Sequence, residues 1–560
     1  MSFSKKAVAA HLKRNEFDDV ERLCREAIAA DQRNGEAWHF RGLAAIGMGA
    51  AERGVQYFLR AIFHKPGDCA MHINLGIALS TLERYDEAGR AFQLAAEFAP
   101  ASFEAQQALA SHYFNREEAE LADVASKAAV ALKPDSIAAW ELQSRIARKR
   151  GDSERSLEAA RRALALNEAL PVSHRLAADA LMRKQEFDAA YEHYVRSLEL
   201  DSEDCEARGN FATLLTRMGH PEEALEHYYH SIKTNPGDDH TRHGLSLALL
   251  TLGRFDEGWP LYAHRTWAYT NPPPKVAPLL ERLPQAGERV LYIADQGPGE
   301  EIMFASLLPE LLRTGAHATV VCNGRLVSLF RRSFPSVRFI ARGTSAAVEA
   351  DWQIGLPDTA KWLRRSFSDF PAEARYLTAD SASTSLMREE YRAGNHLPLI
   401  GISWSTIDKS KVSTQKTIPL HRWGPILSMP GVRFVSLQYG PCEDEIAAAE
   451  KAFGVRITRD PRIDALGDLD TFASQVAAMD LVITTSNTTA HVAGGLGVPA
   501  WTFVPVGHGG FWHWFLARDV SAWYPSVRLF RQKTRGDWQP AIDAVSERFA
   551  GFVENWETGK

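Results

Sequence analysis

The stretch from 84 to 100, RYDEAGRAFQLAAEFAP, has a counterpart 34 residues later, where 118 to 134 read EAELADVASKAAVALKP. A small residue, an alanine and a closing proline occupy matching places in both stretches. Stepping by 34 in either direction extends this pattern from the first residue to about residue 260. A repeat of this length is typical of stacked helical hairpins, each of which needs its neighbours to bury its apolar face.

Three columns and a recurring proline define the repeat. The columns hold small residues (Val20, Gly54, Ala88, Ala122, Ser156, Ala190, Ala224, Gly258), mostly large apolar residues (Cys24, Phe58, Phe92, Ser126, Ala160, Tyr194, Tyr228), and alanine or serine (Ala27, Ala61, Ala95, Ala129, Ala163, Ser197, Ser231). Proline recurs at Pro66, Pro100, Pro134 and Pro236, where it ends a hairpin. The period is that of the tetratricopeptide repeat (TPR), so we predict an α solenoid (TPR superhelix) of about seven and a half repeats over 1–267.

We expect the first helices of the repeats to line a concave groove that holds a peptide or protein. Asn74 and Asn210 occupy the same repeat position and resemble the groove asparagines of the TPR array in O-GlcNAc transferases. The equivalent positions (Phe40, Ala108, Leu142, Leu176, Gly244) are not asparagine, so the groove holds its partner either as an extended strand or as a folded helix. The alternative is a rigid spacer or an oligomerisation arm.

The period stops after Trp267, and a proline-rich connector is predicted over 268–288. A buried strand at 289–295 then leads through a turn with Gly297 and Gly299 into an amphipathic helix, and 318–322 reads as the next strand. This is a βαβ unit, which predicts a parallel sheet with ligands at the carboxyl ends of its strands. The glycines either serve such a ligand or simply allow the tight turn.

A second series starts with a strand at 399–404 and continues through 432–438 to 481–485. The last of these strands runs into the residues SNTTAH at 486–491, where a helix begins. Hydroxyl side chains and free backbone N–H groups at a helix start favour an anion such as phosphate. The competing interpretation is simple capping of the helix by Ser486 or Thr488.

Five motifs in this region carry a family resemblance: GPGEEI at 297–302, IGISW at 400–404, KTIP at 416–419, SLQYG at 436–440 and DLVITTSNTTAHVAGGLG at 480–497. Over about 288 to 550 the chain resembles the GT-B glycosyltransferases of the heptosyltransferase-like family. That resemblance implies an α/β GT-B domain made of two Rossmann-like halves, which we place at 289–395 and 396–560.

The resemblance also implies roles for individual residues. Gly297, Gly299, Lys416, Gln438, Ser486, Asn487, Thr488, Thr489 and His491 would bind the donor, with its phosphates on the helix start at 486–491 and Lys416 neutralising them. Glu300 stands where the family usually has Asp and would be the catalytic base, with Glu301 and Asp295 as substitutes.

Inverting transfer needs a base for the acceptor hydroxyl and positive charge or N–H dipoles for the departing phosphate, and it requires no metal or cofactor. Asp468 and Asp470 spell a D-x-D motif, but they precede a helix and we interpret Asp468 as its cap. Lys409, Lys411 and Lys416 contact phosphates or lie in a solvated loop. The aromatic run at 511–514 either contacts sugar or packs in the core.

The composition indicates which classes of partner the chain has the charge to bind. With 24% charged residues and a net charge of -6, nothing favours nucleic acid or an anionic membrane. The five cysteines form no C-x-x-C pair, so we expect reduced thiols, no structural metal and a cytoplasmic protein.

Three functions fit this sequence. The layout resembles the bacterial TPR glycosyltransferases that modify flagellin, which implies transfer of a sugar, such as pseudaminic acid from its CMP form, to Ser or Thr of flagellin. The second is a heptosyltransferase-like enzyme with a lipid or oligosaccharide acceptor. The third is a catalytically silent scaffold.

Overall fold

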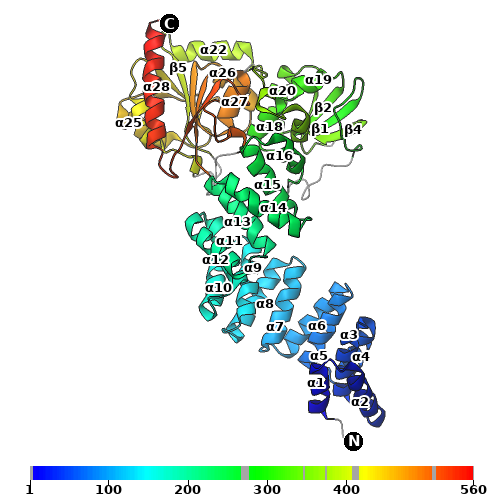
Figure 1. Ribbon diagram of the computed structural model, residues 1–560. Helices are drawn as coiled ribbons and strands as arrows, with labels where there is room; N and C mark the ends of the chain where they lie inside the picture. The colour runs from blue at the N-terminus through cyan, green and yellow to red at the C-terminus, as the bar shows by residue number, and fades with distance from the viewer. Residues whose placement is uncertain are drawn as a thin grey trace. The chain divides into compact units, whose positions relative to one another are not determined.

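A computed structural model describes residues 4–265, 276–344, 347–372, 375–406, 415–507 and 512–558 of the chain. The chain divides into two compact units, Met1–Asp204 and Cys205–Lys560, and each is described by itself. Figure 1 labels most of the helices and some of the strands.

The first unit is a TPR-like solenoid of paired helices. These are α1 (Lys5–Lys13), α2 (Phe17–Ala30), α3 (Gly35–Gly47), α4 (Ala51–His64), α5 (Cys69–Thr81), α6 (Tyr85–Phe98), α7 (Phe103–Asn115), α8 (Ala119–Leu132), α9 (Ile137–Lys149), α10 (Ser153–Leu166), α11 (Pro171–Lys184) and α12 (Phe187–Leu200). The predicted repeat is therefore confirmed for this unit.

Close contact between the two helices of a hairpin requires small residues, both in the predicted column, where a Cβ on Gly54 would lie 2.6 Å from Ile46 on α3, and at a second repeat position. A Cβ atom added to Gly42 of α3 would lie 2.5 Å from the ring of Phe58 on α4. The same clash recurs one repeat later, where a Cβ on Gly76 would lie 2.6 Å from the ring of Phe92. Each aromatic ring thus fills the space that a missing side chain leaves, and both rings are buried.

The first helix of each of four successive hairpins also begins at a repeated N-cap. The side chains of Asn34, Asp68, Ser102 and Ser136 each accept a hydrogen bond from a backbone N–H three residues on. Such a cap satisfies a donor that the helix itself leaves unpaired. The positions are 34 residues apart, so this column belongs to the repeat although the sequence interpretation did not include it.

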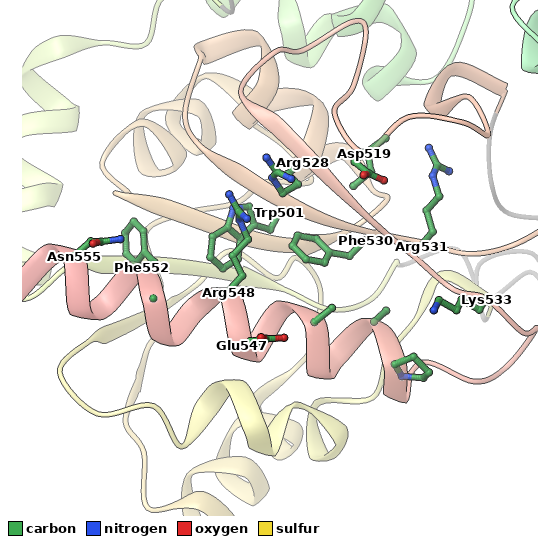
Figure 2. A pocket seen from close by; sticks show the side chains of 15 residues that line it. Trp501, Asp519, Arg528, Phe530, Arg531, Lys533, Glu547, Arg548, Phe552 and Asn555 are labelled. Atoms are coloured by element: carbon green, nitrogen blue, oxygen red, sulfur yellow. The ribbon is translucent and has the colours of Figure 1, made fainter. Parts of the chain in front are cut away.

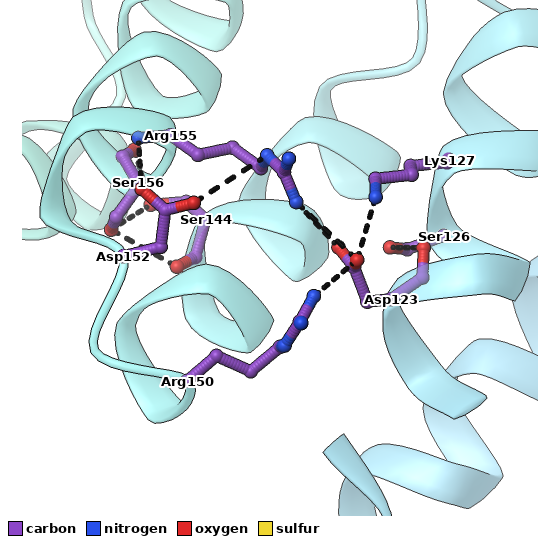
Figure 3. A network of polar contacts seen from close by, with 8 residues as sticks. All are labelled: Asp123, Ser126, Lys127, Ser144, Arg150, Asp152, Arg155 and Ser156. Carbon is purple, nitrogen blue, oxygen red and sulfur yellow. Dashed lines mark hydrogen bonds and ion pairs between the residues drawn. The ribbon is translucent and has the colours of Figure 1, made fainter. Parts of the chain in front are cut away.

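A buried carboxylate links two repeats (Figure 3). Asp123 on α8 is 3% exposed. Its carboxylate accepts hydrogen bonds from Lys127 Nζ at 2.7 Å and Arg155 Nη1 at 3.2 Å, and it also pairs with Arg150. Arg155 lies on α10 and Arg150 caps the end of α9, so this cluster stabilises the contact between consecutive hairpins.

The second unit begins with two more hairpins, which continue the repeat. They are α13 (Cys205–Met218) with α14 (Pro221–Thr234) and α15 (Asp239–Thr251) with the shorter α16 (Phe255–Tyr262), which contains Pro260. Phe255, Trp259 and Tyr262 of α16 are buried in the same apolar core as the α/β part. The indole N–H of Trp259 donates to the carbonyl oxygen of Arg364 at 2.7 Å. The last helix of the solenoid is therefore part of the α/β core.

The remainder holds two parallel sheets, as predicted. The first, in the order β3-β2-β1-β4, consists of β1 (Arg289–Ile293), β2 (His317–Cys322), β3 (Arg338–Ala341) and β4 (Trp352–Gly355). The second, in the order β10-β9-β8-β5-β6-β7, consists of β5 (Leu399–Ser403), β6 (Arg433–Ser436), β7 (Ile457–Thr458), β8 (Leu481–Thr485), β9 (Ala500–Val504) and β10 (Val527–Arg531).

Helices surround both sheets. They are α18 (Pro298–Ala305), α19 (Leu308–Leu312), α20 (Val327–Ser333), α21 (Ala360–Leu363), α22 (Ser381–Arg392), α24 (Gly424–Leu427), α25 (Glu443–Phe453), α26 (Leu469–Ala477), α27 (Thr488–Leu496) and α28 (Gln539–Glu557). The predicted cap of α26 is confirmed, because the Asp468 carboxylate accepts the backbone N–H of Asp470 at 2.9 Å.

The described end of the predicted connector lies along the first sheet. The N–H of Leu280 donates to the carbonyl of Gln353 on β4, and the N–H groups of Val276 and Ala277 donate to the Gln353 side chain. These residues therefore extend the sheet edge instead of spanning solvent as a free spacer. Pro272, Pro273 and Pro274 lie outside the described residues.

Candidate functional site

The two glycine-rich turns meet through the helices that follow them. In Figure 1, α18 follows β1 in the first sheet and α27 follows β8 in the second, and the two helices are in contact. A Cβ atom on Gly299 would lie 2.8 Å from the ring of His491 on α27. Gly299 is thus required by the close approach of the two halves, in addition to forming the turn.

Three acids follow β1 within seven residues, and the structure separates them. The side chain of Asp295 is fully buried and pairs with Arg265 at 2.9 Å. The carboxylate of Glu301, also fully buried, pairs with Arg342 and accepts the backbone N–H of Asn323 at 2.7 Å. Both of these groups thus have partners, one in the first half of the α/β part and one three residues after the end of α16.

Glu300 makes no ion pair among the described residues. Burial raises the pKa of its carboxyl group, and the Gly297 N–H, Lys416 and Arg265 oppose that rise. Burial also raises the pKa of Glu301 to about 7, against the pull of Asn323 and Arg342. Of the two glutamates predicted as catalytic, Glu300 is the one whose carboxylate is left to accept a proton, and we keep it as the candidate base.

The start of α27 carries buried hydroxyl groups without partners. Asn487 caps the helix by accepting the N–H of Thr489 at 3.0 Å. The Ser486 and Thr489 hydroxyls are buried and make no hydrogen bond to the described chain, and the same holds for Thr406 after β5. Buried polar groups normally have a partner, so these three hydroxyls suggest a polar ligand at the carboxyl ends of β5 and β8.

Lys416 supplies the positive charge at this site. Its side chain is almost fully buried, and its charge acts on Glu300, His491 and His513. Burial, and then Lys416, lower the pKa of His491 to about 3, so this imidazole is neutral at physiological pH. Its Nδ1 lies 2.9 Å from the Tyr524 hydroxyl, which fixes the orientation of the ring.

Gln438 and Asn487 hold the chain that leaves β5. The Gln438 side-chain oxygen accepts the N–H groups of Trp404 and Ser405, each at 2.9 Å. The Asn487 side-chain nitrogen donates to the Ser403 hydroxyl at 2.9 Å and to the Ser405 carbonyl at 3.2 Å. The sequence interpretation gave both residues direct contact with the donor, and the structure adds that they shape the loop beside it.

A small cavity of about 190 Å³ adjoins this loop, lined by Gln438, Tyr439, Gly440, Asp460, Phe472 and Gln475 among others. The Tyr439 hydroxyl contacts Thr488, so the cavity adjoins the start of α27. Its polar and aromatic lining suits the ring of a nucleoside whose phosphates lie at the helix start.

The aromatic run predicted either to contact sugar or to pack in the core is placed in the core for its described residues. Trp512, His513 and Trp514 are buried, and the Trp512 ring packs edge-on against Trp259 at 5.4 Å. Phe511, Lys409 and Lys411 lie outside the described residues.

The two predicted groove asparagines lie in different units. Asn74 on α5 is partly buried, and its side-chain nitrogen lies 2.7 Å from Nε2 of His39 on α3. Asn210 lies on α13 and is partly buried as well. Asn74 therefore links two neighbouring repeats, and contact with a peptide would compete with this bond.

A larger groove of about 820 Å³ lies elsewhere, between β10 and α28 (Figure 2). Trp501, Phe530 and Phe552 contribute rings to it, and Arg528 and Arg548 contribute charge. None of the predicted site residues lines this groove. Its size therefore does not make it the candidate site, because the buried unpartnered hydroxyls lie at the carboxyl ends of the strands.

One trio of potential metal ligands occurs in the described parts of the chain: His11, Glu16 and Asp19 in the first hairpin. Asp19 pairs there with Arg22, and His11 with Glu16. In the same described parts, no helix combines the length and apolar character needed to cross a membrane.

Comparison with known proteins gives one curated relative of note. The chain is 32% identical over 284 residues to the protein FlbA of Caulobacter vibrioides, a match covering 48% of this chain and 47% of FlbA. The chain thus spans about half the length of this relative. No family model matches the chain.

Solved structures similar to the chain are helical repeat proteins. The Cut9–Hcn1 hetero-tetramer of the APC/C matches with a TM-score of 0.37 and 16% identity over 43% of this chain and 48% of that one. YrrB, a TPR protein with an unusual peptide-binding site, matches with a TM-score of 0.29 and 20% identity over 34% of this chain and 97% of that one. PilF of Pseudomonas aeruginosa matches with a TM-score of 0.34 and 15% identity over 38% of this chain and 96% of that one.

Proposed function

We propose that this protein is a metal-independent GT-B glycosyltransferase that moves a sugar from a nucleotide to a Ser or Thr hydroxyl of an acceptor protein. The observation that carries the proposal is the set of buried hydroxyls of Ser486, Thr489 and Thr406, which have no partner in the described chain, beside the contact of α27 with α18, the helix that carries Glu300. Of the three acids after β1, Glu300 is the one that makes no ion pair among the described residues. A helix start with free donors suits the donor phosphates, and a partly buried carboxylate without an ion pair suits a base.

The chemistry balances with these groups. The acceptor oxygen attacks the anomeric carbon and loses its proton to the Glu300 carboxylate, while the bond between that carbon and the phosphate oxygen breaks. The electron pair leaves with the nucleotide, whose new charge Lys416 and the backbone N–H groups at the start of α27 stabilise. His491, held neutral by burial and by Lys416, adds no charge of its own.

The solenoid would dock the acceptor and so raise the local concentration of its hydroxyl groups at the site. We propose flagellin as the acceptor and CMP-pseudaminic acid as the donor. This choice rests on the resemblance in layout to the bacterial TPR glycosyltransferases of flagellin.

The test is the intact mass of flagellin from cells with and without this gene. We expect a loss of mass per flagellin in the deletion strain, restored by the native gene and not by Glu300→Gln or Lys416→Ala. Glu281→Gln, which changes an exposed glutamate, serves as the control and should restore the mass. An unchanged flagellin mass in the deletion strain would exclude flagellin as the acceptor.

A purified protein that shows no thermal shift with CMP, UDP or GDP and no hydrolysis of CMP-pseudaminic acid would favour the scaffold function. Transfer to a lipid or oligosaccharide with no change in flagellin would favour the heptosyltransferase-like function.

A further inference from the structure

Arg265, at the end of the solenoid, reaches the carboxyl ends of two strands in the first sheet. Its Nη2 lies 2.9 Å from Asp295, which follows β1. Its Nη1 lies 2.6 Å from Asp358, which follows β4. The Arg265 and Asp295 side chains are 3% and 0% exposed, and that of Asp358 is 19% exposed, so the pair with Asp295 is the buried one.

The surrounding chain is built to accept this side chain. The guanidinium lies 4.6 Å from the centre of the Tyr262 ring and also donates to the Tyr262 carbonyl at 2.9 Å. At the end of β4, a Cβ atom on Gly355 would lie 3.2 Å from Arg265 Nη2 and 2.4 Å from the Asp358 carboxylate. Glycine is therefore needed there for the ion pair to form.

The position of Asp295 connects this arrangement to the candidate base. Asp295 immediately precedes the turn at 296–297, and Gly297 in that turn caps α18, whose first turn carries Glu300. The Gly297 N–H also lowers the pKa of the Glu300 carboxyl group. Asp295 is thus joined to the base through a turn of two residues.

We propose that Arg265 is a positioning residue for the transfer reaction: by binding Asp295 and Asp358 at once, it makes the last helix of the solenoid a fixed wall of the site. The inference rests on the proposed function. It implies that the repeats do more than dock an acceptor, because part of the site's geometry is set by a solenoid residue.

The same contacts bring charged groups close to Glu300 and Asp295 and so affect the pKa values of both carboxyl groups. The groups that act on Glu300 or respond to its charge are Lys416, Arg265, Tyr262 and Tyr524, with His491 across the close approach at Gly299. Burial raises the pKa of Asp295 to about 6, and Arg265 opposes the rise. Arg265 also lowers the pKa of Glu300, so its removal should raise that pKa and leave less of the base ionised.

Three variants of the full chain test this inference. Arg265→Gln removes the charge. Arg265→Gln/Asp295→Asn removes a buried charge of each sign, which keeps the protein folded if the single variant is unstable. Arg254→Gln is the matched control, because Arg254 directly precedes α16. In the described part of the chain, its ion pair is with the exposed Glu257.

Two readouts are needed. The first is the pKa of Glu300, from the carboxyl ¹³C resonance that disappears in Glu300→Gln. The second is turnover of CMP-pseudaminic acid with flagellin, as a function of pH. We expect both Arg265 variants to lose about 10- to 100-fold in kcat with CMP affinity unchanged. In Arg265→Gln, the Glu300 pKa and the acidic limb of the pH profile should also move to higher pH.

The inference is overturned if Arg265→Gln titrates like the native chain, or if the double variant recovers turnover together with stability. In either case Arg265 only balances charge. If the native chain itself turns over no donor while Glu300 titrates as expected, the proposed function fails, and the positioning role falls with it.

Discussion

Asp295, Glu300 and Glu301 lie within one short segment, yet each carboxylate has a different environment. Arg265 holds the first and Arg342 the third, while the pKa of Glu300 is lowered by the Gly297 N–H and by the charges of Lys416 and Arg265. Burial without an ion pair raises the pKa of Glu300, and a raised pKa makes the ionised carboxylate a stronger proton acceptor.

Replacement of Glu300 by glutamine should remove the base while keeping its shape. We expect kcat to fall about 10²- to 10⁴-fold, because that is what a positioned base contributes. Nucleotide affinity, measured by calorimetry with CMP, should stay within about twofold. Glu281→Gln should behave like the native chain, and equal losses in both variants would contradict the assignment.

His491 makes stability depend on pH. Its pKa in the folded protein is about 3, against an ordinary value of 6.5, because the ring is buried beside Lys416. Below pH 6.5 the unfolded chain takes up a proton that the folded chain refuses, so stability is complete above 6.5 and falls as the pH drops towards 3.

Urea unfolding at pH 7.5 and pH 5 should show this loss in the native chain and a smaller loss in His491→Gln. The control is His317→Gln, which changes an exposed histidine on β2 and should leave the difference between the two pH values unchanged. An identical difference in His491→Gln would show that this ring titrates normally.

At the scale of elements, the hairpins owe their positions to side-chain size and to caps. Gly42 and Gly76 face Phe58 and Phe92, and Asn34, Asp68, Ser102 and Ser136 start the first helices of their hairpins. Both features recur every 34 residues, so they could be predicted from the sequence. The link between repeats through Asp123 could not, because it occurs once.

Asp123→Asn should loosen the contact between the hairpin of α7 and α8 and that of α9 and α10. The carboxylate is buried, but Lys127, Arg150 and Arg155 are about one third to one half exposed and can be solvated when it is neutralised. We therefore expect a loss of about 1–2 kcal/mol in the first urea transition, less than for a fully buried pair.

Glu158→Gln is the control, because Glu158 and Arg162 form an exposed pair on α10. It should cost less than about 0.5 kcal/mol. Burial disfavours the charged carboxylate, but Lys127, Arg150 and Arg155 together lower the pKa of Asp123, so its stabilising effect is lost as the pH falls through that lowered value.

At the scale of the whole molecule, the last hairpins of the solenoid belong to the same compact unit as the α/β part. The second compact unit starts at Cys205 and takes in the last two hairpins, and the rings of α16 are buried with residues of both sheets. The boundary predicted at 267 follows the end of the repeat in the sequence, whereas the compact unit follows the packing of the core.

Trp259→Ala should therefore destabilise the α/β part and α16 together. Loss of a buried indole and of its bond to the Arg364 carbonyl should cost about 3–5 kcal/mol. Scanning calorimetry should show the transition of the second unit at lower temperature, with the first unit unaffected. Tyr229→Ala changes an exposed ring of α14 and should have a small effect.

The sequence by itself determined the repeat, the two parallel sheets and the segment that holds the candidate site. These follow from local patterns of size and polarity that persist along the chain, and the strand positions agree with prediction to within a few residues. The GT-B assignment of the α/β part remains a proposal that rests on resemblance.

Only the tertiary structure decided which acid is left without an ion pair and which residues shape the site. Arg265 lies 30 positions from Asp295 and 93 from Asp358, and Asn487 lies 84 from Ser403. Single contacts at such separations leave no periodic signal in the sequence. They exist because folding brings the carboxyl ends of several strands and the last helix of the solenoid to one place, where burial makes every unpaired charge costly.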